Sequence, residues 1–175
     1  MVSGQARGRA LSAPLPEHVR PTTDRVKESI FDMLGSLGGV EDLEILDLFC
    51  GSGALGIEAL SRGAASVTFV DSERRCLDAA QANLACVGLA EAPARFVRAS
   101  LPGWSAPSVD LVFADPPYAM VDLGDLLETL QAQIVVLETG EEPAVPERWV
   151  VHRQRRYGTT LVTVLIAPSD VESDS

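Results

Sequence analysis

A glycine turn between an apolar run and a helix is the feature that most constrains how this chain folds. The apolar run covers residues 43–49 and has the length of a strand, and residues 54–62 after the turn are typical of a helix. Gly51 and Gly53 permit a tight turn between the two and let a ligand approach the backbone without meeting a Cβ. The amides that open the following helix then form a site for an anionic group.

Strands and helices continue to alternate along the rest of the chain. Strands are expected at 43–49, 66–70, 94–97, 109–114, 134–137, 148–156 and 159–166. Helices are expected at 22–37, 54–62, 72–87 and 123–130. This order predicts a Rossmann-like α/β domain with a mostly parallel seven-stranded sheet, an antiparallel last strand and helices on both faces. Such sheets bind ligands at the carboxyl ends of their strands.

The composition is that of a single domain, with 175 residues of which 46% are hydrophobic and 22% charged. No stretch approaches the roughly 18 consecutive apolar residues of a membrane helix, and the N-terminus lacks the apolar segment of a secretion signal. The three cysteines form neither a metal-binding spacing nor an even-numbered disulfide framework. We therefore expect a reduced, cytoplasmic protein that holds no metal and contacts no membrane.

The formal net charge of −11 argues against a nucleic-acid partner, because phosphate binding depends on Lys and Arg. The charge is unevenly distributed, however, since residues 1–27 carry a net +3 and residues 148–156 a net +4. These segments are either ordinary solvated surface or parts of one local positive face. We expect a basic arm at 1–21 that is irregular or a small hairpin, a folded domain at 22–167 and a disordered acidic tail at 168–175.

An acidic residue, Asp71, ends the second expected strand, twenty residues after Gly51. A carboxylate there can accept both hydroxyls of a ribose, so the turn and Asp71 predict a nucleoside ligand. The alternative is a purely structural turn with two surface acids. Asp47, at the mouth of the turn, would repel the pyrophosphate of a dinucleotide and attract the ammonium and sulfonium groups of S-adenosylmethionine. We favour S-adenosylmethionine over NAD, and a structural cap remains the other explanation of Asp47.

A stiff acidic turn, Asp115-Pro116-Pro117-Tyr118, follows the expected strand at 109–114. The two prolines restrict the loop and remove two backbone donors, which leaves carbonyl acceptors in excess. Asp115 and the Pro116 carbonyl can accept the two N–H bonds of a planar amine while Tyr118 stacks on the attached ring. The nitrogen lone pair can then face a methyl sulfonium. The alternative is a plain loop with Tyr118 at the surface.

Together these segments resemble the RsmD family of bacterial 16S rRNA (guanine-N2)-methyltransferases, which are class I S-adenosylmethionine enzymes. The matching stretches are 4–11, 20–28, 46–64, 115–118 and 157–159, and they extend over almost the whole chain. The segment that begins Arg20-Pro-Thr and the long glycine stretch are specific, whereas many amino methyltransferases share the Asp-Pro-Pro-Tyr turn. The chain departs from the family at Cys50, where a small Ala is expected, and at Lys27, which replaces an arginine.

The resemblance implies methyl transfer from S-adenosylmethionine to the exocyclic N2 amine of one guanine in 16S rRNA, within the small ribosomal subunit. We expect a monomer whose catalytic residues are Asp115, Pro116 and Tyr118. The residues implied to lie at the cofactor are Asp47, Gly51, Gly53, Asp71, Ser100, Thr22 and Thr23. The residues implied to bind RNA are Arg7, Arg9, Arg20, Arg25 and Lys27.

Other functions stay open at this point. The same chemistry could serve the amines of adenine or cytosine in DNA, or a protein amide. An NAD-linked oxidoreductase lacks an evident catalytic histidine, because His18 lies in the arm and His152 in the last expected hairpin. A non-catalytic RNA-binding protein would bind the cofactor without any transfer. Cys50 as a nucleophile for carbon methylation is less favoured than a small buried thiol in the turn.

Overall fold

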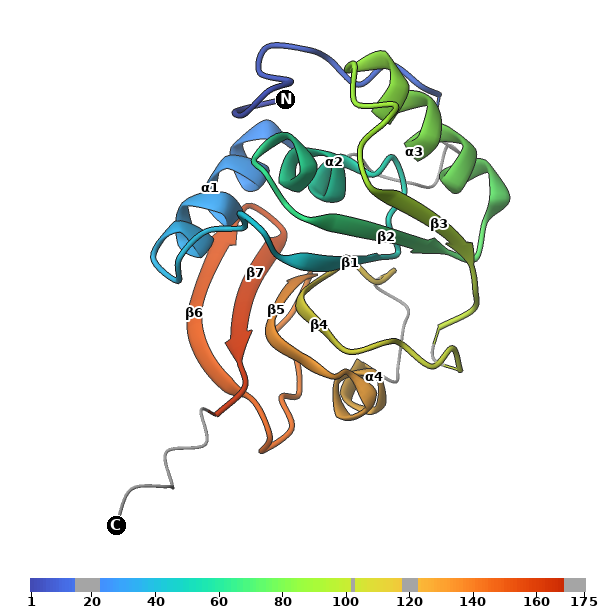
Figure 1. Cartoon of the computed structure of the whole chain (residues 1–175). Coiled ribbons are helices and arrows are strands. Elements are labelled where there is room, and N and C mark those ends of the chain that lie inside the picture. The colour runs from blue at the N-terminus through green and yellow to red at the C-terminus, as the bar shows by residue number, and fades with distance from the viewer. Residues whose placement is uncertain (15–22, 102, 118–122, 169–175) are drawn as a thin grey trace.

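The computed structural model describes residues 1–14, 23–101, 103–117 and 123–168. Its helices are α1 (Asp24–Gly35), α2 (Ala54–Ser61), α3 (Arg74–Cys86) and α4 (Leu123–Thr129). Its strands are β1 (Glu44–Leu48), β2 (Ser66–Asp71), β3 (Ala94–Arg98), β4 (Val109–Ala114), β5 (Ala132–Thr139), β6 (Val150–Tyr157) and β7 (Thr160–Ile166). Figure 1 shows these elements arranged around one twisted sheet.

The sheet has seven strands in the order β3-β2-β1-β4-β5-β7-β6. The pairs from β3 to β5 are all parallel, and β7 runs antiparallel to both β5 and β6. The expectation of a mostly parallel sheet with an antiparallel last strand is therefore confirmed, and the fold is that of Rossmann-like class I methyltransferases. Because six strands share one direction, the carboxyl ends of β1, β2 and β4 meet at a single edge.

The two faces of the sheet are covered unequally (Figure 1). Helices α1, α2 and α3 pack on one face, where buried residues such as Ile30 and Phe113 belong to the larger apolar cluster. On the other face, α4 is the one helix among those described, and Leu127 joins Trp149 in a second cluster. The expectation of helices on both faces holds, but loops cover much of the second face.

Helix α1 begins two residues later than the pattern at 22–37 predicts. Thr23 is its N-cap, with an extended backbone and a side-chain oxygen that accepts a hydrogen bond from the Val26 amide at 3.4 Å. A capping threonine stands outside the helix that it stabilises, which explains the difference. Among the described residues, no helix has the length and apolar character that a membrane crossing requires.

The first fourteen residues are irregular and form a strap that packs closely on α2 and α3. Ala6 is completely buried, and the Gln5 amide donates to the Ser61 carbonyl at 2.8 Å. Gly4, with φ +74°, sits so close that a Cβ there would lie 1.8 Å from the Ser61 carbonyl oxygen. The rest of the expected arm, 15–21, and the tail beyond Pro168 lie outside the described residues.

Candidate active site

The glycine turn connects β1 to α2 through a run of left-handed backbone. Phe49, Gly51 and Gly53 have φ values of 56°, 51° and 75°, and glycine reaches such values at little cost. The Cys50 amide donates to the Val70 carbonyl at 3.2 Å, which ties the turn to β2. A Cβ on Gly53 would lie 2.9 Å from the Ala80 side chain, so the turn also packs closely on α3. Sequence and packing together fix the turn in one conformation.

Asp47 lies beneath this turn and caps it from inside. Its Oδ2 accepts a hydrogen bond from the Gly56 amide at 2.9 Å, and the residue is only 4% exposed. Burial raises the pKa of Asp47 to about 8, opposed in part by that hydrogen bond and reinforced by the negative charges of Asp115 and Asp71. The structural cap that the sequence left open is therefore present, whereas a direct contact between Asp47 and a cofactor stays a prediction.

Asp71 ends β2 with its carboxylate held in a fixed orientation. One oxygen accepts a hydrogen bond from the Gly51 amide at 3.1 Å, and the other accepts from the Glu73 amide at 2.9 Å. The Cys76 side chain also forms a hydrogen bond with this carboxylate, and since each carboxylate oxygen has two lone-pair directions, the group retains an acceptor position for a further donor. The residue is half-buried, so a ligand at the turn can reach it. Its position beside Gly51 is the one that the sequence predicts.

Asp115 and Pro116 follow β4 directly, at the same edge as the glycine turn. The register pairs Ala114 with Leu48, so Asp115 lies one residue beyond the end of β1. Burial raises the pKa of the Asp115 carboxyl to about 6, so it is ionised at neutral pH. Tyr118, the stacking residue expected from the sequence, lies outside the described residues. The structure thus brings the acid and the rigid carbonyl of the predicted pair to the turn.

Asp71 and Asp115 make this edge of the sheet electronegative, whereas Asp47, with its pKa of about 8, is mostly protonated at neutral pH. The charges of Asp115 and Asp71 add to the effect of burial on the pKa of Asp47. Such an edge disfavours a pyrophosphate and favours a ligand with cationic groups. Burial also raises the pKa of the Cys50 thiol far above its usual range, so the turn holds a neutral thiol and not a thiolate nucleophile.

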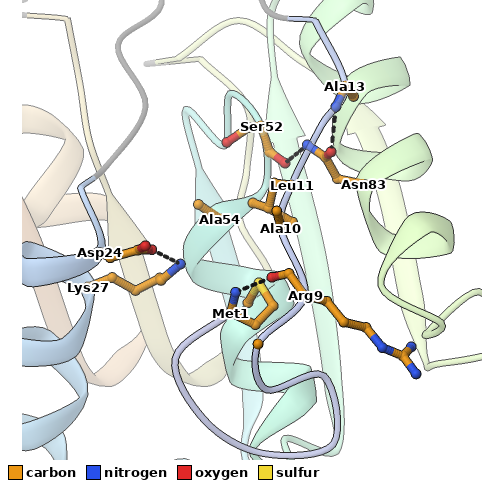
Figure 2. Close-up of a pocket in the computed structure, with 11 residues that line it drawn as sticks. Met1, Arg9, Ala10, Leu11, Ala13, Asp24, Lys27, Ser52, Ala54 and Asn83 are labelled. Carbon is orange, nitrogen blue, oxygen red and sulfur yellow. Dashed lines mark hydrogen bonds and ion pairs between the residues drawn. The ribbon is translucent and has the colours of Figure 1, made fainter.

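A cavity of about 450 Å³ opens beside the turn, between the strap, α1 and α3 (Figure 2). Ser52 and Ala54 of the turn form part of its wall. Lys27 of α1 lines the same cavity, is 3% exposed and forms an ion pair with Asp24 at 3.0 Å. Lys27, one of the residues predicted to bind RNA, is therefore buried in the wall of this cavity.

Asn83 of α3 is a residue that sequence analysis missed. It is fully buried, its Oδ1 accepts from the amides of Ser12 and Ala13 at 3.0 and 2.9 Å, and its Nδ2 donates to the Ser52 carbonyl at 3.1 Å (Figure 2). One side chain therefore joins the strap to the glycine turn. The available signal was its position on the same side of the helix as the apolar residues Ala80 and Leu84.

The remaining predicted residues are dispersed. Ser100 is exposed and follows β3, where the preceding Ala99 amide donates to the Asp71 carbonyl at 3.1 Å, so it lies at the predicted edge. Arg7 and Arg25 are exposed, whereas the Arg9 guanidinium donates to the Val87 carbonyl. Thr23 is the helix cap described above. Thr22 and Arg20 lie outside the described residues.

Comparisons with known proteins agree with this geometry. Residues 1–166 match the family model described as conserved hypothetical protein 95. The chain is 34% identical over 188 residues to ribosomal RNA small subunit methyltransferase D of Escherichia coli K12, covering 100% of this chain and 93% of that protein. The Haemophilus influenzae protein of the same name is 31% identical, with 90% and 88% covered. The solved structure of the Escherichia coli protein yhhF superposes with a TM-score of 0.81 at 33% identity, covering 95% of this chain and 96% of that one.

Proposed function

Because this chain belongs to the conserved hypothetical protein 95 family, we propose that it is an S-adenosylmethionine-dependent methyltransferase that modifies the exocyclic N2 amine of one guanine in 16S rRNA. The observation that carries the proposal is the position of Asp115 and Pro116 beside the glycine turn and Asp71. An acceptor pair for an amine and a pocket for a nucleoside then meet at one edge of the sheet.

The residues of this edge fit S-adenosylmethionine, which supplies the methyl group as an electrophile on a cationic sulfur. We assign the fixed carboxylate of Asp71 to accept hydrogen bonds from the ribose hydroxyls. We assign Ser100, two residues after β3, to the adenine. The acidic surroundings complement the ammonium and sulfonium groups, which a dinucleotide lacks.

The part of the chain that acts on the substrate is Asp115 with Pro116. Ionised Asp115 accepts one N–H of the guanine amine and the Pro116 carbonyl accepts the other, which holds the nitrogen with its lone pair directed at the methyl group. The guanine must leave its stack to enter the site, and we assign Tyr118 to stack on the flipped base. Transfer is then a direct in-line displacement in which this chain orients the reactants and forms no covalent bond.

We further propose that the substrate is the assembled small ribosomal subunit, that the enzyme acts as a monomer, and that the reaction takes place in the cytoplasm where such subunits assemble. The names of the Escherichia coli and Haemophilus influenzae relatives, which specify small subunit rRNA, support the choice of RNA. The alternative substrates that the experiment must exclude are DNA amines and protein amides.

The test is transfer of a radioactive methyl group to small subunits isolated from a strain that lacks the enzyme. We expect label in 16S rRNA, recovered as N2-methylguanosine after digestion to nucleosides, and no label with subunits from the parent strain. Naked 16S rRNA, plasmid DNA and total protein serve as parallel substrates. Label found only in DNA or protein would contradict the proposal, and label in naked rRNA but not in subunits would contradict its assembled-subunit part.

A further inference from the structure

Strand β6 is a basic edge strand that the proposed reaction does not use. Six of its eight residues are exposed, and it carries three arginines and no acid. It ends the sheet on one side, so one of its edges is unpaired (Figure 1). The net charge of the whole chain is −11, so this strand is a local region of positive charge on an acidic protein. Such a region can attract an anionic partner.

The sheet register places this strand level with the active site. Ala114 of β4 pairs with Leu137, Leu137 with Thr163, and Thr163 with Gln154 of β6. Strand β6 runs in the same direction as β4. Arg155 follows Gln154 just as Asp115 follows Ala114, so Arg155 and Asp115 lie at the same level of the sheet. Three strand spacings of about 4.8 Å separate them, so Arg155 lies on the order of 14 Å from Asp115 along the same edge.

Arg153 and Arg155 project from the face of the sheet that α1 covers. They pair with Val164 and Val162, and residues directly opposite in an antiparallel pair share a face. Both valines belong to the apolar cluster under α1. Tyr157, two residues after Arg155, is on that face too, and its hydroxyl contacts the Ser29 hydroxyl of α1.

Helix α1 extends this line of arginines. Arg25 lies four residues before Ser29, one turn nearer the start of the helix and on the same side. Arg25, Arg155 and Arg153 are all exposed, and we call them the arginine row. In the described part of the chain, their guanidinium groups form neither an ion pair nor a side-chain hydrogen bond. By contrast, Arg156 on the opposite face donates to the Gly140 carbonyl at 3.0 Å.

The acids packed near this row leave it unneutralised. Glu28 and Asp32 are the exposed acids of α1 that follow Arg25, and neither forms an ion pair with the row among the described residues. The row is therefore a set of solvated cations beside an edge that is otherwise acidic. A polyanion that approaches the active site meets attraction there and repulsion at the acids of the edge.

We propose that the arginine row holds the phosphate backbone of the RNA strand that carries the target guanine, a few nucleotides away from the flipped base. The inference rests on the proposed function for the choice of RNA. Two observations favour it over the contacts predicted for Arg9 in the strap and Lys27 in α1: the Arg9 guanidinium is bound to the Val87 carbonyl, and Lys27 is buried in an ion pair. The row supplies exposed cations at the level of Asp115 that those two residues do not.

The test is the double variant Arg153→Ala with Arg155→Ala, measured with small subunits and with a 16S rRNA fragment that contains the target. We expect KM for subunits to rise about tenfold at physiological salt while the affinity for S-adenosylhomocysteine and kcat stay unchanged. The slope of log Kd for the fragment against log salt should fall by about 1.5, because each phosphate contact contributes roughly 0.7–0.9.

The matched control is Arg75→Ala with Arg95→Ala, which removes the same charge from exposed positions near the opposite end of the sheet. We expect the control to change KM and the salt slope by much less. Equal effects of the two double variants, or no effect of the first, would overturn the inference. Each of these comparisons requires that the unaltered enzyme methylates RNA. If the unaltered enzyme transfers no methyl group to RNA, the proposed function itself has failed, and that result is distinct from a failure of this inference.

Discussion

Asn83 of α3 donates a hydrogen bond from Nδ2 to the backbone carbonyl of Ser52, at 3.1 Å, inside the glycine turn. The oxygen of the same side-chain amide accepts the backbone N–H groups of Ser12 and Ala13 in the strap. Asn83 is fully buried and so is its contact with Ser52, whereas its two contacts with the strap are partly buried. The conformation of the strap and that of the glycine turn are therefore linked through one side chain.

Replacing Asn83 separates these two roles. Asn83→Ala leaves the buried Ser52 carbonyl without its partner, which costs about 1–3 kcal/mol, and removes the acceptor of two partly buried strap amides, so the free energy of unfolding should fall by about 2 kcal/mol in urea denaturation. Asn83→Asp keeps the acceptor for the strap and loses the donor to Ser52. We expect this variant to bind S-adenosylhomocysteine more weakly in calorimetry while the strap stays protected from proteolysis. Wild-type affinity in both variants would show that the turn does not depend on Asn83.

Asp115 should control turnover and not cofactor binding. Asp115→Asn keeps the shape of the side chain but removes the charge, and a charged acceptor contributes about 1.5–3 kcal/mol to a hydrogen bond. We expect kcat at neutral pH to fall by about 10- to 100-fold, with the affinity for S-adenosylhomocysteine within twofold of wild type. S-adenosylhomocysteine is the suitable probe because it lacks the sulfonium charge. Unchanged kcat would exclude Asp115 as the amine acceptor.

The pKa of Asp115 gives the same assignment a second test. The carboxyl must be ionised to accept the amine, and burial raises its pKa to about 6. The rate of the unaltered enzyme at saturating substrate should therefore fall as the pH drops below about 6 and level off above about 7. Asp115→Asn should lack this dependence between pH 5 and 7. A profile that is flat in the unaltered enzyme over that range would contradict the role of the carboxylate.

Asp47 should make the protein less stable as the pH rises from about 4 to about 8. Its pKa of about 8 in the folded protein lies above the value of about 3.9 for an unfolded chain. The folded state therefore binds more protons within that window, and the free energy of unfolding decreases with increasing pH. Asp47→Asn retains an acceptor for the Gly56 amide and removes the titration, so its decrease should be smaller in urea denaturation at several pH values. Asp32→Asn, at an exposed position of α1, serves as the control for the loss of one carboxyl group.

The sequence predicted the elements of the sheet well because their patterns are local. The strand expected at 109–114 is β4 with the same bounds, and the turn at Gly51 and Gly53 lies where the strand–helix junction places it. The edge shared by Asp71 and Asp115 also follows from the order of strands and helices alone. Each of these predictions depends on residues near one another in the chain or on the general geometry of parallel sheets.

The packing of the strap could not be predicted because its contacts are distant in sequence. Glu58 accepts from the amides of Val2 and Ser3, both at 2.8 Å and more than 50 residues away. Nothing in the composition of the first fourteen residues indicates that α2 offers these acceptors. The burial of Lys27, which the resemblance implies to bind RNA, likewise depends on the distant strap and glycine turn that line the same cavity.

Gly56, in the first turn of α2, should tolerate a methyl group poorly. A Cβ there would lie 2.4 Å from Cε1 of Phe69 and 2.9 Å from Oδ2 of Asp47, in the contact between α2 and the sheet. Gly56→Ala should therefore reduce the free energy of unfolding by about 1–3 kcal/mol and weaken S-adenosylhomocysteine binding, because α2 must move away from Asp47. The control is Gly124→Ala in α4, where a Cβ meets nothing within 4 Å. It should stabilise the protein by about 0.4–1 kcal/mol and leave binding unchanged. Equal stability of the two variants in chemical denaturation would show that α2 does not depend on the close approach at Gly56.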